Sequence, residues 1–183
     1  MSEAPMLLSL LQKRRSIRVF EDTAVEAETV TMLTEAVLRT YSSRGNDPWE
    51  FLWITRPELL QGLSRSKQHG STFLAGAPLA LVICADESKS DVWIEDCSIA
   101  ATIVQLTAAS LGLGSCWVQI RLRPHDEKIS AEAFVRELLD IPENYRVEAI
   151  IGLGYPGEEK AGHSAESLKS ERIHTNGFGR SRQ

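Results

Sequence analysis

The chain has 183 residues, 43% of them hydrophobic and 25% charged, values typical of a single water-soluble globular domain. Twenty lysines and arginines against 25 aspartates and glutamates give a net charge of -5, which argues against a nucleic-acid-binding protein, since such proteins carry a basic face. The longest nearly apolar run, residues 73–85, contains Gly76 and Pro78 and is shorter than the ~20 residues of a membrane-spanning helix, so we expect no membrane partner.

The first third of the chain predicts two helices and a strand. Residues 5–13 are expected to form a short helix with Pro5 in its first turn. Residues 24–40 predict a stronger helix, because their apolar side chains recur at helical spacing. A polar turn over 42–48 then leads into a strand over 49–55, which is rich in aromatic and apolar residues.

The middle of the chain predicts a buried strand and the longest helix. Residues 57–66 indicate a short helix, and 78–85 a strand buried on both faces. The longest helix is expected over 91–111, and its half from 97 to 111 has apolar or small residues on nearly every face. A helix without a polar face must be covered on all sides, so we expect it to lie at a dimer interface.

The last third predicts two strands, a helix and an arm. Gly112 is expected to end the long helix in a left-handed conformation, and an extended segment follows over 115–120. A helix over 130–140 and a strand over 146–153 come next. The polar C-terminal end is expected to be a tail or an arm lying on a partner, extended over about 170–183.

These elements predict one domain over residues 1–183 of the α+β class, because helices and strands do not alternate strictly. The three cysteines, Cys84, Cys97 and Cys116, are far apart in apolar contexts, which indicates buried thiols in a reducing compartment and therefore a cytoplasmic protein. The four histidines lack the clustered spacing of metal ligands, so no metal site is expected.

Residues 152–157, Gly-Leu-Gly-Tyr-Pro-Gly, match the spacing of a dinucleotide-binding loop and follow a predicted strand. Such a loop must also open a helix, whose N-terminus meets the pyrophosphate. Pro156 and the polar residues after it favour a turn, so we interpret this match as the end of a strand.

The most informative segment is Arg14-Arg15-Ser16-Ile17-Arg18, a local concentration of positive charge in an acidic protein. Guanidiniums and a hydroxyl are suited to binding a small phosphorylated ligand. The alternative is structural, since basic residues at a helix end offset the helix dipole and cap free carbonyls.

Four segments together resemble the nitroreductase family of flavin enzymes in their order and spacing, and they span residues 6 to about 160. They are the following: Arg14-Arg15-Ser16-Ile17-Arg18-Val19-Phe20; residues 42–51, ending in Pro48-Trp49-Glu50-Phe51; residues 108–117, ending in Gly114-Ser115-Cys116-Trp117; and residues 151–156. The resemblance implies a layered fold with a central, mostly antiparallel sheet flanked by helices. It also implies a homodimer with FMN at the subunit interface, which NAD(P)H reduces in a ping-pong cycle.

The resemblance further implies roles for individual residues. Arg14 and Ser16, with Arg15 adjacent, are expected to hold the phosphate and ribityl chain of FMN, and a late basic residue, Lys160 or its competitor Lys169, to complete the phosphate site. The residues expected around the flavin ring are Arg18 at the pyrimidine edge, Ser42, Ser43 and Arg44 from the partner subunit, and the backbone of Trp117, Val118, Gln119 and Ile120 near N5.

The chain departs from the family pattern at two places. The family's loop has Asn and then Gln before Pro-Trp, whereas here Gly45 and Asp47 hold those positions and Asn46 is shifted by one. The stretch with Lys67 and His69 lacks the Asn and Lys that some relatives place near the flavin, and either residue could substitute.

Because flavin itself carries out hydride transfer, an enzyme of this family requires no side-chain nucleophile or base. The guanidinium of Arg18 would stabilise the negative charge of reduced flavin near N1 and O2. We therefore expect an oxidoreductase that transfers electrons from NAD(P)H to a small acceptor such as a nitroaromatic or a quinone. The alternative is a flavin-binding protein without robust turnover, such as a carrier, a sensor or a flavin-modifying enzyme.

Overall fold

The computed structural model describes residues 5–180 and is built on one four-stranded sheet. Its strands are β1 (Trp49–Ile54), β2 (Leu79–Asp86), β3 (Gly114–Gln119) and β4 (Tyr145–Gly154). Their order is β1-β2-β4-β3, and every neighbouring pair is antiparallel. The α+β class and the antiparallel sheet expected from the sequence are therefore confirmed.

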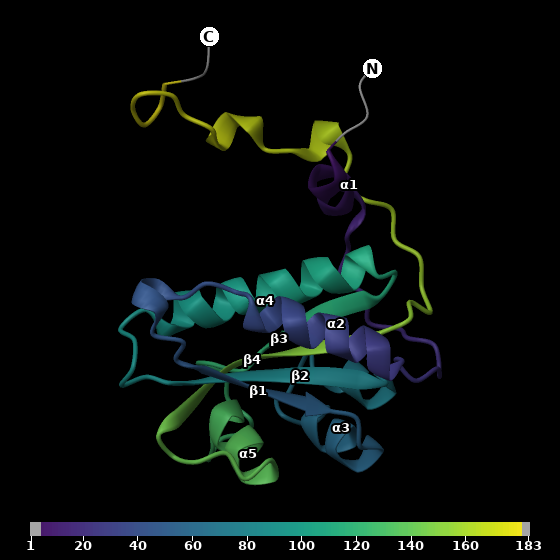
Figure 1. Cartoon of the computed structure of the whole chain (residues 1–183), viewed down its shortest axis with the longest axis vertical. Helices are drawn as coiled ribbons and strands as arrows, with labels where there is room; N and C mark the ends of the chain where they lie inside the picture. The colour runs from purple at the N-terminus through teal and green to yellow at the C-terminus, as the bar shows by residue number, and fades with distance from the viewer. Residues whose placement is uncertain (1–4, 181–183) are drawn as a thin grey trace.

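Helices cover both faces of this sheet (Figure 1). The helices α2 (Ala27–Leu38) and α4 (Trp93–Ser110) lie on one face, and α3 (Pro57–Leu63) and α5 (Ala131–Leu138) on the other. Each face has its own apolar core: Leu33 packs with α4 in the first, and Leu63 packs with Val135 in the second. Because β2 and β4 are central and covered twice, both are continuously apolar over most of their length.

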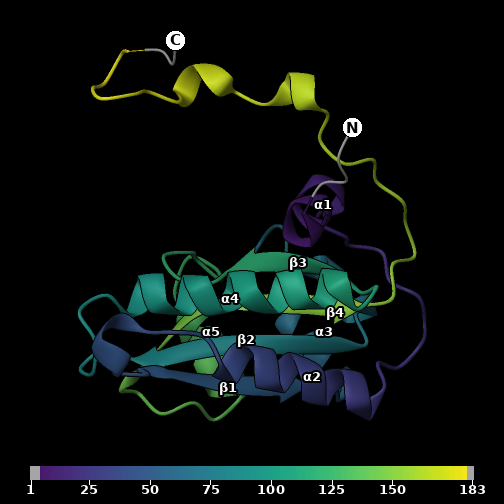
Figure 2. The same cartoon turned by 45° about the horizontal axis from the view of Figure 1, so that its top comes forward.

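The long helix α4 runs along one face of the sheet beside α2 (Figure 2). Its small residues Ala100, Ala101 and Ala108 are buried against the sheet and α2. Gly112 follows it with φ +79°, a left-handed conformation that confirms the predicted end of the helix. The side with Ile99 remains half-buried in the single chain.

The N-terminal segment after helix α1 (Met6–Lys13) runs along the free edge of β3. Ser16 forms a parallel bridge with Ser115, and the Ile17 amide donates to the Ser115 carbonyl at 3.0 Å. This close approach requires glycine at position 114, because a Cβ there would lie 2.8 Å from the Cβ of Ile17. The basic segment thus extends the edge of the sheet.

The segment after β4 returns to the same edge. The Gly157 amide donates to the Val19 carbonyl at 2.9 Å, and the Glu158 carboxylate accepts from the amides of Arg18 at 2.6 Å and Val19 at 3.2 Å. These bonds place residues 157–160 directly beside the basic segment.

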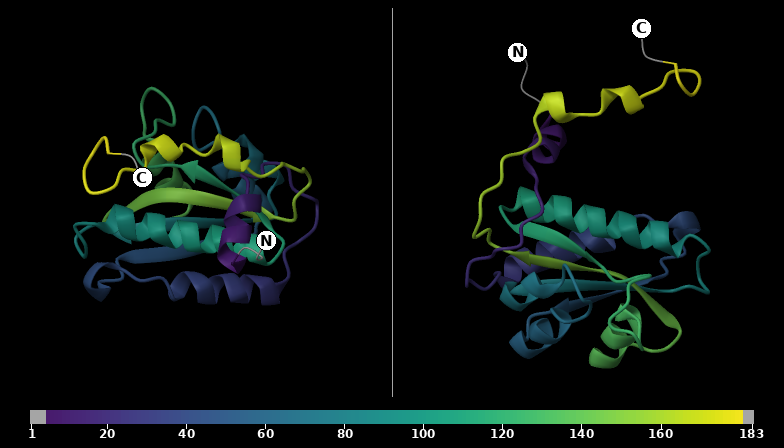
Figure 3. Two further views of the ribbon diagram at one scale, coloured as in Figure 1. Left: turned by 90° about the horizontal axis from the view of Figure 1, so that it is seen from above. Right: turned by 180° about the vertical axis from the view of Figure 1, so that it is seen from behind.

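Beyond this contact the chain leaves the sheet as an arm. Residues 161–180 are all exposed and contain two 3-10 turns, Ala165–Ser167 and Ser170–Arg172. In Figure 3 the arm passes α1 and runs on away from the layers. Residues 181–183 of the predicted arm lie outside the described residues. No helix in the described part of the chain is both long and apolar enough to cross a bilayer.

The Glu158 contacts make a pH-dependent contribution to stability that can be measured. Lys160, whose Nζ lies 2.7 Å from Glu158 Oε1, and the Arg18 amide lower the pKa of Glu158 to about 2 from its ordinary value of 4.5. A depressed carboxyl pKa stabilises the fold above the unfolded pKa, and this stabilisation disappears as the pH falls toward the folded pKa. Glu158→Gln should therefore lower the free energy of unfolding by a constant amount at pH 5–7 and by progressively less between pH 4.5 and 2.

Urea unfolding across this pH range would measure the difference between the wild type and the variant. Glu159→Gln neutralises the exposed neighbouring carboxylate and is the charge-matched control. An equal pH dependence in both variants would contradict the role assigned to Glu158.

Candidate functional site

Four of the residues expected to bind phosphate and flavin, Arg14, Ser16, Arg18 and Lys160, lie at the edge of β3 that contains Cys116. Burial raises the pKa of the Cys116 thiol, while Arg18, the Ser16 hydroxyl, Lys160 and Arg14 act in the opposite direction. Cys116 is 1% exposed, and the Lys160 Nζ contacts the carbonyl of Ser16, which bridges to Ser115 next to Cys116. Residues from both ends of the chain therefore form one cationic cluster.

Lys160 is attached to this cluster by two contacts. Its Nζ donates to the Ser16 carbonyl at 3.1 Å and to Glu158 Oε1 at 2.7 Å. The competing Lys169 is exposed and precedes the second 3-10 turn of the arm, which lies beyond α1 in Figure 1. Of the two late lysines considered from the sequence, Lys160 is the one that lies at this cluster.

A groove of about 510 Å³ opens beside the cluster, between α1, the end of α4 and residues 156–161. Four cations and two carboxylates line it, in contrast to the acidic chain as a whole: Lys13, Arg14, Arg15 and Lys160 against Glu158 and Glu159. Arg15 also donates to the carbonyl of Ala161, which ties its guanidinium to the start of the arm. Guanidiniums and an ammonium in a concave setting favour a phosphorylated or otherwise anionic ligand.

Residues 117–119 continue the same edge of the sheet from Ser115. Trp117 Nε1 donates to Gln119 Oε1 at 3.0 Å, and Gln119 Nε2 donates to the carbonyls of Arg121 at 3.2 Å and Glu148 at 3.4 Å. Val118 is fully buried in the core under α5. This stretch is therefore rigidly held, and its Ser115 end lies next to Ser16.

Ser42, Ser43 and Arg44 do not reach the cationic cluster within one chain. They precede β1, at the opposite edge of the sheet from β3, so the sheet alone separates them by three strand spacings of ~4.8 Å. The Ser43 amide contacts Asp96 at the start of α4, whereas the groove touches the end of this helix, whose 18 residues span about 27 Å. The structure thus brings the expected site residues together as two separate groups.

Three further residues, Lys67, Arg123 and Ser66, were given little weight or were missed when the sequence was considered alone. Lys67 is half-buried, and burial together with Arg123 lowers its pKa, while Cys116 raises it. Lys67 is thus close enough to Arg123 and Cys116 to interact electrostatically with both, whereas His69 is exposed. Arg123 was not predicted, because its position in the loop after β3 gives no signal in the sequence. Ser66 is fully buried, and its hydroxyl has no partner among the described residues.

Two further expectations concern sites that the sequence argued against. The glycine-rich match at 152–157 ends β4 and opens no helix, so its interpretation as a strand end is correct. Within residues 5–180 no group of histidine, cysteine and acidic side chains has the geometry of a metal site. The cysteines at 84, 97 and 116 are buried and unpaired.

Comparisons with known proteins identify the family to which this chain belongs. The sequence model of the Nitroreductase family matches residues 11–155. A protein of Archaeoglobus fulgidus named as an NADH dehydrogenase/NAD(P)H nitroreductase is 36% identical over 172 residues, which cover 91% of this chain and 95% of that protein.

Two solved structures are similar over nearly the whole chain. An FMN-dependent nitroreductase from Clostridium difficile superposes with a TM-score of 0.92 and 46% identity, covering 93% of this chain and 99% of the other. A nitroreductase from Desulfovibrio desulfuricans in complex with FMN has a TM-score of 0.75 and 25% identity, covering 97% and 99%. Because the family model matches residues 11–155, which are most of the chain, this chain belongs to the nitroreductase family.

Proposed function

We propose that this protein is an FMN-dependent oxidoreductase that transfers electrons from NAD(P)H to a small acceptor, such as a nitroaromatic or a quinone, in a ping-pong cycle. The observation that carries the proposal is that Arg14, Ser16, Arg18 and Lys160 come together at the edge of β3. Lys160 contacts the Ser16 carbonyl and Glu158, Glu158 accepts from the Arg18 amide, and Arg14 lines the same groove as Lys160. FMN ends in a phosphomonoester, and a cluster of cations with a hydroxyl fits that group. Membership of the nitroreductase family and the FMN-dependent relative support the same cofactor.

The residues of the cluster divide into two tasks. Arg14, Ser16 and Lys160, with Arg15 adjacent, bind the phosphate and ribityl end. Arg18, two positions beyond Ser16, places its exposed guanidinium at the pyrimidine edge of the ring. Bound FMN supplies the electron-transfer chemistry, so these residues bind, orient and tune it without acting as acids or bases.

The segment from Trp117 to Gln119 has the rigidity that a flavin ring requires. Its side chains are bonded to one another and to the backbone of β4, so the strand presents a fixed wall along the edge that begins at Ser16. We assign the backbone of this segment to the N5 side of the ring. A fixed wall reduces the conformational entropy that the protein loses on binding.

The second group of residues completes the site from a partner subunit. Ser42, Ser43 and Arg44 cannot contact the flavin held by their own chain, because β1 and β3 are opposite edges of the sheet. In a two-fold dimer with antiparallel α4 helices, this loop of one subunit comes to the groove at the end of the partner's α4. The half-buried Ile99, Ile103 and Leu106 of α4, with exposed Tyr41 nearby, supply an apolar contact surface.

The three buried, unpaired cysteines are those of a protein in a reducing compartment, and we propose that the enzyme acts in the cytoplasm. The exposed arm at 161–180 is available to lie on the partner subunit.

The test of the function is rapid mixing of the purified, FMN-loaded protein with NADH and with NADPH. We expect the flavin absorbance near 450 nm to bleach within milliseconds to seconds. It should return on addition of a nitroaromatic or a quinone under anaerobic conditions. Stable binding of FMN without bleaching by either nucleotide would instead indicate a flavin carrier or sensor, and absence of FMN binding would refute the proposal.

Arg18→Ala is expected to lower the midpoint potential of the bound flavin and to slow its reduction by NAD(P)H, with a smaller effect on the FMN dissociation constant. The reason is that a guanidinium at the pyrimidine edge stabilises the negative charge of the reduced ring. Redox titration and fluorescence titration measure the two quantities.

The matched variant combines Arg14→Ala with Ser16→Ala. It should raise the FMN dissociation constant at least 100-fold, because it removes a charged and a neutral hydrogen bond to the phosphate. If Arg18→Ala released FMN while the potential of the remaining holoenzyme stayed unchanged, the division of tasks would be wrong.

Ile103→Glu should dissociate the dimer, because it places a charge in the apolar side of α4. The dissociated subunit should also bind FMN more weakly, since the partner's loop is then absent. Sedimentation velocity and fluorescence titration measure both effects. Gln61→Glu, an exposed site on α3, is the control; a dissociated variant with unchanged FMN affinity would contradict the shared site.

A further inference from the structure

The carboxylate of Asp96 joins three parts of the chain at the start of α4. Asp96 is 2% exposed. Its Oδ1 accepts from the Ser43 amide at 2.9 Å, and its Oδ2 accepts from the Ser90 hydroxyl at 2.9 Å. Both carboxylate oxygens are therefore occupied, and the position in the first turn of α4 is electrostatically favourable for a negative charge. The contact with Ser43 reaches 53 residues back along the chain.

The loop that Asp96 holds has an unusual backbone. Arg44, Gly45 and Asp47 have φ values of +57°, +67° and +43°, and residues other than glycine rarely adopt this region. The Ser42 hydroxyl closes the loop on itself, donating to Asp47 Oδ1 at 2.6 Å and accepting from the Asp47 amide at 2.9 Å. A self-closed loop keeps its shape, but these bonds do not fix its orientation on the rest of the molecule.

The bond to Asp96 supplies that orientation. Among the described residues, it is the one side-chain hydrogen bond between the loop of residues 42–47 and a residue outside it. It ends on the Ser43 amide, next to the strained Arg44. A shift of the Ser43 backbone would therefore redirect the Arg44 side chain, which is exposed and carries the positive charge of the loop.

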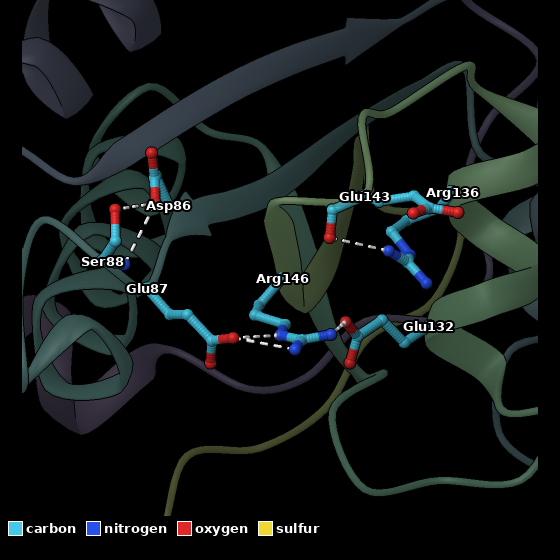
Figure 4. Close-up of polar contacts among 7 residues, drawn as sticks. All are labelled: Asp86, Glu87, Ser88, Glu132, Arg136, Glu143 and Arg146. Atoms are coloured by element: carbon cyan, nitrogen blue, oxygen red, sulfur yellow. Dashed lines mark hydrogen bonds and ion pairs between the residues drawn. The ribbon is translucent and has the colours of Figure 1, made fainter.

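The second oxygen of Asp96 is held by an equally fixed segment, the loop between β2 and α4. Figure 4 shows how this loop is anchored: Ser88 donates its amide and hydroxyl to Asp86 at 3.0 and 2.7 Å, and Glu87 pairs with Arg146 of β4 at 2.7 Å. Arg146 in turn contacts Glu132 of α5 at 3.5 Å. Ser90 thus donates from a loop connected to the sheet, and the Asp96 side chain is restrained from both sides.

We propose that Asp96 is a positioning residue for the flavin: it fixes Ser43, and through Ser43 the direction of Arg44, so that this loop meets the FMN bound by the partner subunit. The proposal rests on the proposed function, in which Ser42, Ser43 and Arg44 of one subunit complete the flavin site of the other. In this proposal the side chains of Ser42 and Asp47 fix the shape of the loop, since they form a hydrogen bond with each other.

The test compares Asp96→Ala and Asp96→Asn with the wild-type holoenzyme. Asp96→Ala should raise the FMN dissociation constant about 10-fold, because the loop that carries Ser43 and Arg44 must then be ordered when the ligand binds. It should also lower the flavin midpoint potential, because the positive charge of Arg44 moves away from the ring. Asp96→Asn keeps the size of the side chain and one acceptor oxygen, so an intermediate effect is expected, and it preserves the test if Asp96→Ala does not fold.

Ser130→Ala is the control for a purely structural effect. It removes the hydroxyl that caps α5 by accepting from the Ala133 amide at 3.0 Å, and it should lower the unfolding midpoint without changing the flavin potential. Hydrogen exchange of the Ser43 amide in protein free of flavin reports on the Asp96 bond directly and should be faster in both Asp96 variants.

The outcomes separate this proposal from the proposed function. Wild-type protein that binds no FMN would refute the function and, with it, the role of Asp96. Wild-type protein that binds FMN, with Asp96 variants of unchanged FMN affinity and potential, would refute the role of Asp96 alone. Asp96 variants that match Ser130→Ala in stability and in potential would show that the residue serves the fold only.

Discussion

The pairing of the N-terminal segment with the edge of β3 is the interaction on which the cationic cluster depends. The Ser16–Ser115 bridge is made by backbone atoms, so it fixes the position of Arg14, Arg15 and Arg18 whatever their side chains do. It is possible because residue 114 is glycine, which allows Ile17 to lie against the strand. Unpaired edges of a sheet invite association, and here the edge is occupied by a segment of the same chain.

A second constraint follows from the sizes of the elements. The helix α4 is long, and the sheet places β1 and β3 at its two margins, so the loop before β1 and the cluster beside β3 are too far apart to share one ligand within a chain. Within residues 5–180, the side of α4 that contains Ile99, Ile103 and Leu106 is only half-buried. The proposed dimer accounts for both observations, because it covers the half-buried side of α4 and brings the loop before β1 of one subunit to the cluster beside β3 of the other.

The charges of the site illustrate how a small cationic region is kept in an acidic protein. Several positive groups lie close together, and repulsion between them is reduced by Glu158, which pairs with Lys160 and accepts from the amide of Arg18. Burial lowers the pKa of Lys67, and the nearby positive charge of Arg123 adds to this effect. An anionic ligand would relieve this repulsion, which is an electrostatic reason for the site to bind one.

The sequence by itself determined the elements and their class. Apolar periodicity and the turn residues located the five helices and four strands of the described chain to within about three residues, because spacing along the chain is a local property. It also marked residues 14–18, since three arginines around a serine are conspicuous in a chain of net charge -5. The contact of Lys160 with Ser16, the electrostatic interaction of Lys67 with Arg123, and the bond from Ser43 to Asp96 are visible only in the tertiary structure. These contacts join residues tens to more than a hundred positions apart, and their distances depend on strand order and on which edge of the sheet each segment reaches, neither of which is encoded by local spacing.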